Sequence, residues 1–158
     1  MSDKKLQYSP LSEVDMARAS SDFLSSMRLR RSVREFSSRD IPIEVVKNIV
    51  STAASAPSGA NKEPWHFTIV NDPGVKNEIR VGAEIEEKAF YKHKAPKSWL
   101  KDLNKFGTDW NKEFLEVAPY LIIVFKQIYD LNNGEKYNNY YVNESVGIAC
   151  GFLLTAIH

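Results

Sequence analysis

The sequence predicts an α+β fold, in which layers of helices pack with a small number of strands. Most of the chain has apolar residues at helical spacing, whereas two short runs, 65–70 and 119–127, are continuously apolar and β-rich. The composition is that of a globular protein, 43% hydrophobic and 26% charged over 158 residues. Because we find no internal repeat, low-complexity tract or linker, we expect a single domain over residues 1–158 with one hydrophobic core.

The first half of the chain is expected to form two helices and then a strand. Residues 12–29 begin with a serine, a residue that favours the helix N-cap, and continue with apolar residues at roughly helical spacing. Residues 41–56 show the same spacing with a proline near the first turn, and a proline and a glycine just beyond their end stop the helix. The run "WHFTIV" at 65–70 predicts a strand, and "NDPG" turns the chain after it.

The second half adds two more helical stretches, a buried strand and a final helix. Residues 75–93 are amphipathic. Residues 98–117 carry one apolar stripe, interrupted by a glycine, at i, i+4, i+7 and i+11: Trp99, Leu103, Phe106 and Trp110. Such a stripe is usual for a core helix. The run "PYLIIVFKQ" at 119–127 predicts a buried strand, and the helix from Tyr140 has two glycines one turn apart that would permit close helix packing.

Charge and cysteine content exclude several classes of protein. The net charge is +1, from 21 basic and 20 acidic residues, so no bulk field favours nucleic acid or an anionic membrane. The lone Cys150 excludes an intrachain disulfide framework, and no histidine has the spacing of a metal ligand, so we expect no metal. The N-terminus has no apolar leader and no stretch is long enough to cross a bilayer. We therefore expect a soluble, cytoplasmic protein without a membrane anchor.

The run "RLRRSVR" at 28–34 is the first candidate binding element. Its arginines surround Ser32, and guanidinium groups bind phosphate bidentately while a hydroxyl completes the shell. For an isolated cluster, a solvated basic turn is the more common explanation. A role in nucleic-acid binding is disfavoured, because nothing aromatic or basic extends the cluster.

The run "APSGANKEPW" at 56–65 is the second candidate. A helix end with a glycine breaker explains Pro57 and Gly59, but it does not explain small residues followed by an asparagine and Glu-Pro-Trp. Small residues let the backbone approach a flat ligand, so that its N–H and C=O groups make the contacts. Together with the arginine cluster, this run would seat a planar ring with a phosphate tail.

The runs "RRSVREF" and "APSGANKEPWHFTIV", and the "AP" before the second apolar strand, resemble the FMN-dependent nitroreductase superfamily. The runs "GAEIEEKAFYKH", "SWLKDL" and "DWNKEFLEVAP" resemble the iodotyrosine deiodinase family within it, and the similarity extends over residues 28–158. The resemblance implies a nitroreductase-like fold, a mixed sheet flanked by helices, and a homodimer with FMN sites at its interface. Members of the family continue beyond the position of His158, so we expect the domain to lack its C-terminal portion.

The resemblance also implies roles for individual residues. Arg30, Arg31, Ser32, Val33 and Arg34 would hold the FMN phosphate and ribityl tail, and Pro57, Ser58 and Gly59 would lie against the isoalloxazine ring. The Ala60 N–H would face the phenolate of a halogenated tyrosine, while Glu87, Tyr91 and Lys112 would hold its zwitterion. The segment 98–117 would be a cover that orders over bound substrate, with Gly107 suited to a mobile element, and this stays an alternative to the core helix. No catalytic residue is assigned, since in this family the cofactor carries the electrons.

The zwitterion residues also make physical sense as a group. Glu87 and Tyr91 are separated by four residues, so they share one face of a helix. A carboxylate binds the substrate ammonium and Lys112 its carboxylate, although each residue alone is more often an ordinary surface residue.

The resemblance therefore implies an FMN-dependent oxidoreductase that removes iodine from mono- and diiodotyrosine, with NADP-linked reduction. Two alternatives stay open: a general NAD(P)H nitro- or quinone reductase, and a non-catalytic module that binds flavin or halotyrosine. A nitroaromatic compound has no amino-acid zwitterion to bind. The presence of Glu87, Tyr91 and Lys112 therefore favours the deiodinase over the general reductase.

Overall fold

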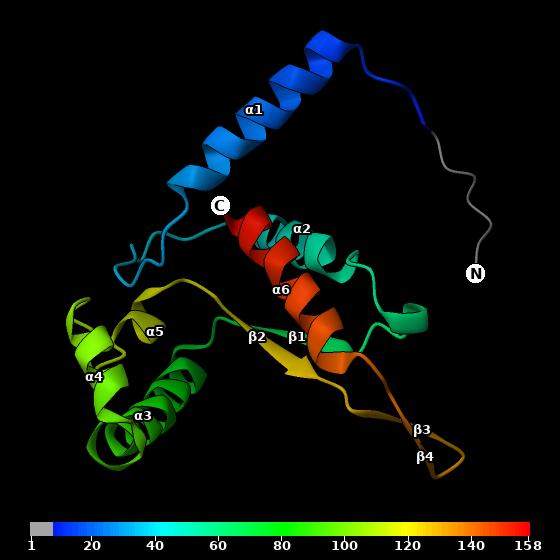
Figure 1. Cartoon of the computed structure of the whole chain (residues 1–158). Coiled ribbons are helices and arrows are strands. Elements are labelled where there is room, and N and C mark those ends of the chain that lie inside the picture. The colour runs from blue at the N-terminus through cyan, green and yellow to red at the C-terminus, as the bar shows by residue number, and fades with distance from the viewer. Residues whose placement is uncertain (1–7) are drawn as a thin grey trace. The chain divides into compact units, whose positions relative to one another are not determined.

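Figure 1 shows the fold as a computed structural model, which describes residues 8–158. The elements in chain order are α1 (Glu13–Leu29), α2 (Ile43–Ala54), β1 (Trp65–Val70), α3 (Pro73–Ala89), α4 (Lys97–Asn104), α5 (Phe114–Val117), β2 (Leu121–Lys126), β3 (Tyr129–Asn132), β4 (Glu135–Asn138) and α6 (Val142–Ile157). A 3₁₀ turn, η1 (Gly59–Asn61), precedes β1, and a π-helix, η2 (Phe90–Lys94), continues α3. The first seven residues of the N-terminal stretch that we expected to lack a leader lie outside the described residues.

The chain divides into two compact units, one ending at Ser32 and also taking in His158, the other Val33–Ile157. The first unit is built on α1, which confirms the helix expected over 12–29. Ser12 caps it, because its Oγ accepts a hydrogen bond from the backbone N–H of Asp15 at 3.2 Å. No residue of α1 is buried.

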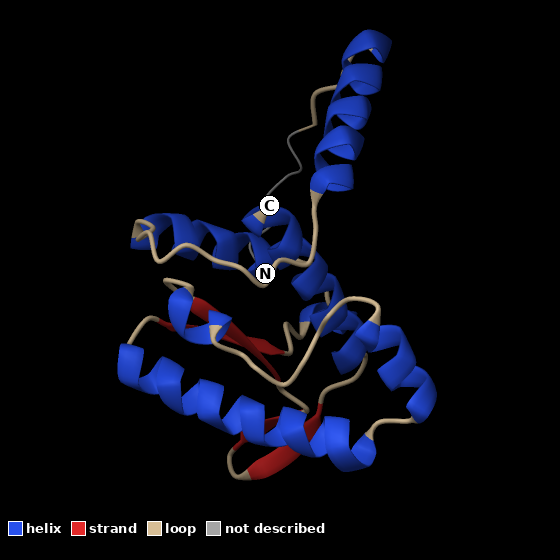
Figure 2. Cartoon of the chain, turned by 90° about the vertical axis from the view of Figure 1, so that its left-hand side faces the viewer, coloured by secondary structure: helices blue, strands red, loops and turns tan. Residues whose placement is uncertain are grey.

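The second unit is organised around the antiparallel pair β1–β2, in which Trp65 lies opposite Lys126 and Val70 opposite Leu121. Helix α6 contacts β2 and packs against α2, and the buried side chains between and beneath these helices include Val46, Ala53, Ala149 and Leu153. Helices α2 and α6 lie on one side of the strands and α3 on the other (Figure 2). Because helices cover both faces, both strands read as apolar runs rather than as alternating ones.

The α+β class is confirmed, but the sheets differ from the mixed sheet we expected. In residues 8–158 the strands form two antiparallel pairs, β1–β2 and β3–β4. A mixed sheet would need a further strand that runs parallel to β1 or β2 beside it. The chain between β1 and β2 forms helices instead of such a strand. The β2 strand is also half-buried rather than buried.

The β3–β4 hairpin was not predicted. Its turn is formed by Asn133 at φ 52° and Gly134 at φ 84°, the left-handed geometry that suits a two-residue hairpin turn. The sequence "NNG" carries this signal, but short polar strands around it gave no apolar pattern.

The helix expected over 98–117 is broken into two pieces. Helix α4 ends at Asn104, Gly107 adopts φ 61°, and the short α5 begins at Phe114. The apolar stripe is therefore discontinuous, and its core interpretation is wrong, since the Phe106 side chain is 79% exposed and Trp99 and Trp110 are also exposed. The helix expected over 75–93 is confirmed as α3 with its π-helical continuation.

Candidate active site

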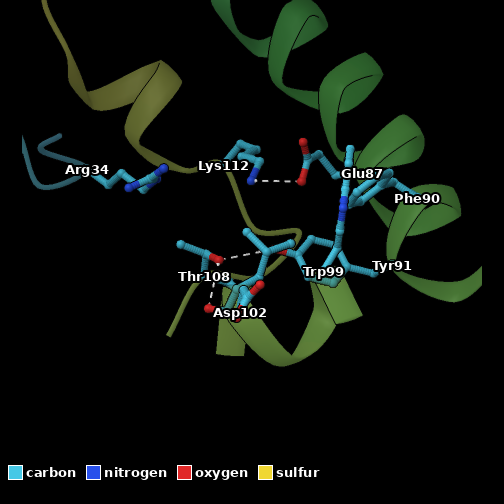
Figure 3. Close-up of a pocket in the computed structure, with 9 residues that line it drawn as sticks. Arg34, Glu87, Phe90, Tyr91, Trp99, Asp102, Thr108 and Lys112 are labelled. Atoms are coloured by element: carbon cyan, nitrogen blue, oxygen red, sulfur yellow. Dashed lines mark hydrogen bonds and ion pairs between the residues drawn. The ribbon is translucent and has the colours of Figure 1, made fainter. Parts of the chain in front are cut away.

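A cavity of about 360 Å³ lies within the second unit, between the end of α3, the π-helix, α4 and the loop that precedes α5. Figure 3 shows its lining from these elements, with Glu87, Tyr91 and Lys112 among the labelled side chains. The residues that line it are Arg34, Glu87, Phe90, Tyr91, Trp99, Asp102, Leu103, Thr108 and Lys112. Three of the four predicted substrate residues and one predicted cofactor residue are therefore brought to one cavity.

Glu87 and Lys112 face each other as an ion pair. Lys112 Nζ lies 3.2 Å from Glu87 Oε2, and the Lys112 side chain is only 15% exposed. Lys112 Nζ also donates a hydrogen bond to the backbone carbonyl of Asp109 at 2.8 Å. A lysine and a glutamate that are 25 positions apart in sequence thus place opposite charges on one cavity wall, the arrangement that an amino-acid zwitterion requires.

Tyr91 ties the loop after α4 to the cavity. It follows Glu87 by four residues, and the helix changes from α to π between them, a change often found at functional sites. Its hydroxyl donates to the Thr108 carbonyl at 3.1 Å and lies 3.3 Å from Thr108 Oγ1. Thr108 Oγ1 in turn donates to the carbonyl of Leu103 at 3.3 Å, so the tyrosine contacts the segment between α4 and α5.

A second polar group lies one turn before Glu87 on α3. Glu84 Oε1 accepts from Arg80 Nε at 2.8 Å and from the backbone N–H of Lys112 at 3.0 Å. The hydrogen bond from Arg80, followed by that from Lys112, holds the pKa of Glu84 below its ordinary value, and the same bond raises the pKa of Arg80. Sequence reasoning missed both residues, although their i, i+4 spacing on a helix predicts an ion pair.

The predicted cofactor residues divide between the two units. Arg30, Arg31 and Ser32 belong to the first, where the Arg31 guanidinium donates to the carbonyls of Arg28 and Arg30 at 2.6 and 2.8 Å. Val33 and Arg34 begin the second unit, and both side chains are exposed.

The loop from Pro57 to Ala60 packs against the start of α6. The Gly59 N–H donates to Ser145 Oγ at 3.3 Å, and a Cβ added at Gly59 would lie 3.0 Å from Tyr141 Cδ2. Ser58 Oγ accepts from the backbone N–H of Glu63 at 2.8 Å. Gly59 and Ser58 therefore stabilise the loop itself, in addition to any contact with a ligand.

Three residues at the end of this loop and just beyond it have positive φ angles. Ala60, Asn61 and Glu63 have φ values of 47°, 54° and 47°, in the left-handed region that non-glycine residues seldom adopt. Among residues 8–158, the Ala60 N–H donates no hydrogen bond to another residue, and Ala60 is exposed. This strained segment presents a backbone donor, although Ala60 is not among the residues that line the cavity.

The described residues hold neither a metal-binding cluster nor a membrane-spanning helix. Within 8–158 no three His, Cys, Asp or Glu side chains are grouped so that they would hold a metal ion. None of the helices in this part of the chain combines the length and the apolar character needed to cross a membrane.

Comparison with known sequences identifies the class of protein to which this fold and cavity belong. The sequence profile of the nitroreductase family matches residues 27–158, and the chain belongs to that family. Within it, the chain is 57% identical over 145 residues to an iodotyrosine deiodinase of Haliscomenobacter hydrossis, which covers 91% of this chain and 65% of the relative. It is 43% identical to the human iodotyrosine deiodinase 1, over 99% of this chain and 56% of the relative. The chain thus spans about half to two thirds of the length of these curated relatives.

Solved structures give the same placement. A crystal structure of oxidized iodotyrosine deiodinase bound to FMN and 3-iodo-L-tyrosine matches with a TM-score of 0.73 and 36% identity, over 85% of this chain and 68% of that one. An FMN-dependent nitroreductase from Clostridium difficile R20291 matches with a TM-score of 0.59 and 25% identity, over 87% and 55%. The resemblance found in the sequence is confirmed.

Proposed function

We propose that the protein binds FMN and reductively removes iodine from mono- and diiodotyrosine. One observation carries the proposal: Glu87 and Lys112 place opposite charges 3.2 Å apart in a cavity that Tyr91 also lines. A substrate zwitterion would exchange partners with this pair, its ammonium binding Glu87 and its carboxylate binding Lys112. The Lys112 side chain is largely shielded from water, so a charge left there without a partner would be costly. The exchange is favourable because the incoming zwitterion gives each of the two charges a new partner.

The residues of the chain suit FMN. Arg30, Arg31, Ser32, Val33 and Arg34 follow one another in the sequence, and their guanidinium, hydroxyl and backbone donors are of the kind that would hold its phosphate. Pro57, Ser58 and Gly59 would lie along the flat ring, in a loop whose neighbours already hold a strained backbone. When bound, FMN supplies the electron pair that, with one proton, converts the carbon–iodine bond into a carbon–hydrogen bond and iodide.

The Ala60 N–H is the group that we assign to the substrate phenolate. It has no acceptor among the described residues, and Ala60 has a positive φ of 47°. A fixed backbone donor stabilises an oxyanion without reorganising, and iodine makes the phenol more acidic. Selective binding of the ionised phenol would then discriminate halotyrosines from tyrosine.

We propose that α4 and the loop to Trp110 form a cover that excludes water. Trp99 and Leu103 of α4 line the cavity, and Gly107 at φ 61° breaks the segment where a hinge is needed. Excluding water strengthens each electrostatic contact with the substrate.

We also propose a homodimer with FMN sites at its interface. Helix α6 has an open apolar surface that supports this, since a Cβ at Gly147 or Gly151 would touch nothing within 4 Å and Ile148 and Phe152 are exposed. The close helix packing that we expected from the two glycines is thus not made within the described chain. A cytoplasmic location is part of the proposal, because a single cysteine leaves no disulfide to form within the chain.

Iodide release from 3,5-diiodotyrosine tests the proposal, using the FMN-loaded protein with dithionite as the reductant. We expect two iodide ions for each tyrosine formed, with no iodide released by FMN and dithionite in the absence of the protein. Reduction of a nitroaromatic compound without iodide release would select the general reductase instead. Halotyrosine binding without turnover would select a non-catalytic module.

A further inference from the structure

One face of α3 and the π-helix holds the chain segment 108–118 through a row of polar contacts. Lys76 Nζ donates to the carbonyls of Glu116 and Ala118, both at 2.8 Å, and Asn77 donates to the Glu116 carboxylate at 2.8 Å. Further along the helix, Glu84 and Glu87 contact Lys112, and Tyr91 contacts Thr108. The side chains that make this row are Lys76, Asn77, Arg80, Glu84, Glu87 and Tyr91. The helix thus fixes the whole segment that carries Lys112.

Glu84 makes the contact in this row that reaches the backbone of Lys112 itself. Its side chain is 12% exposed, and one oxygen, Oε1, accepts from both Arg80 Nε and the Lys112 N–H. Arg80 is held in turn by two further carboxylates, Glu116 Oε1 at 3.4 Å and Glu113 Oε1 at 3.7 Å. The acceptor for the Lys112 N–H is therefore a carboxylate that is locked in place by a guanidinium group with three acidic neighbours.

We propose that Glu84 is a positioning residue for the substrate-binding lysine, held in its orientation by Arg80. The proposal rests on the proposed function, in which Lys112 binds the substrate carboxylate. Glu87, one turn on, contacts the Nζ of the same lysine that Glu84 contacts at its N–H. Lys112 is thus fixed at both ends of its residue, and a flexible four-carbon side chain is left with few orientations. Without Glu84, the lysine would lose its backbone anchor while keeping its charge.

The consequence is specific for the amino-acid part of the ligand. A halotyrosine uses Lys112, whereas a halogenated phenol without amino and carboxyl groups does not. Loss of the anchor should weaken iodotyrosine binding about tenfold, the effect expected for one charge-assisted hydrogen bond. Binding of 2-iodophenol should change little.

The test compares Glu84→Ala with Glu78→Ala in the FMN-loaded protein. Glu78 is an exposed carboxylate on the same helix, with no ion pair or side-chain hydrogen bond to the described residues, and so controls for the loss of an acidic side chain. Titration calorimetry with iodotyrosine and with 2-iodophenol should show the tenfold loss for Glu84→Ala with iodotyrosine alone. Equal losses with both ligands, or none, would overturn the positioning role. Glu84→Gln keeps an oxygen acceptor for the Lys112 N–H and should restore most of the affinity.

A second readout needs no substrate. Hydrogen exchange of the Lys112 amide should be faster in Glu84→Ala than in the wild-type protein and Glu78→Ala, because the amide loses its acceptor. Unchanged exchange would overturn the inference even if the protein turned out to bind another ligand. Failure of the proposed function would be visible separately, as a wild-type protein that releases no iodide while the exchange result still holds.

Discussion

Replacing Lys112 with alanine removes a cation from the wall of the cavity and leaves Glu87 without its partner in the ligand-free protein. The lost side chain is 15% exposed and has one ion pair at 3.2 Å and one hydrogen bond at 2.8 Å. In the proposed complex it makes a charge-assisted hydrogen bond to the substrate carboxylate, worth roughly 1.5–3 kcal/mol. The substrate carboxylate, left without a cation, adds to this cost, so we expect iodotyrosine binding to weaken by about one to three orders of magnitude, or roughly 1.5–4 kcal/mol.

The assay is a titration of the FMN-loaded variant with 3-iodotyrosine, followed by flavin fluorescence. Lys47→Ala is the matched control, because Lys47 also forms an ion pair, with Glu44 at 2.7 Å, but lies on α2 and does not line the cavity. A second ligand, 3-iodotyramine, keeps the ammonium and lacks the carboxylate, so it should bind Lys112→Ala and the wild-type protein with similar affinity. FMN should stay bound to the variant.

Two results would refute this reasoning. If Lys112→Ala lost its flavin and kept its iodotyrosine affinity, Lys112 would belong to the cofactor site. If iodotyramine lost as much affinity as iodotyrosine, the lysine would act through the shape of the cavity and not through the substrate carboxylate.

Three further predictions follow from the same contacts. Gly59→Ala places a Cβ 3.0 Å from the Tyr141 ring, so thermal denaturation should show a loss of about 1–3 kcal/mol, and an unchanged melting temperature would mean that the ring moves aside freely. Lys76→Ala removes a 7% exposed side chain that donates to two carbonyls at the end of α5, and should lower stability by about 2 kcal/mol; a loss below ~0.5 kcal/mol would show that water replaces the lysine. The pKa of Glu84 is lowered in the folded state, so its contribution is present above the pKa of the unfolded chain and is lost as pH falls through the lower folded value. Hydrogen exchange of the Lys112 amide, corrected for its intrinsic pH dependence, should therefore keep its protection from pH 8 to pH 5, and a loss of protection within that range would contradict the assignment.

The ends of the regular elements were largely predictable from local sequence. The capping serine at position 12 and the β-rich run at 65–70 placed α1 and β1 correctly, since both signals act within a few residues. The break between α4 and α5 was not predictable from apolar spacing. The apolar residues keep their helical spacing across Gly107, whereas the backbone there is not helical. Polar contacts with α3 hold the segment after the break, and these are distant in sequence.

The candidate site, too, was predictable from the sequence only in part. Glu87 and Tyr91 share a helix face, which their spacing of four residues predicts. Their convergence with Lys112 depends on how the chain returns after α4, and the sequence suggested it through family resemblance rather than through spacing. Glu84 was missed, because its acidic surroundings read as an ordinary solvated face and its partner at the Lys112 N–H is a backbone group without a sequence signal.

A crystal structure of the protein with FMN and 3-iodotyrosine would show directly where the amino-acid part of the substrate binds. We expect the Glu87–Lys112 pair to open, with the substrate ammonium on Glu87, its carboxylate on Lys112 and its phenolate on the Ala60 N–H. A substrate whose amino and carboxyl groups lie elsewhere, with the 3.2 Å pair intact, would contradict the assignment of this cavity as the amino-acid site.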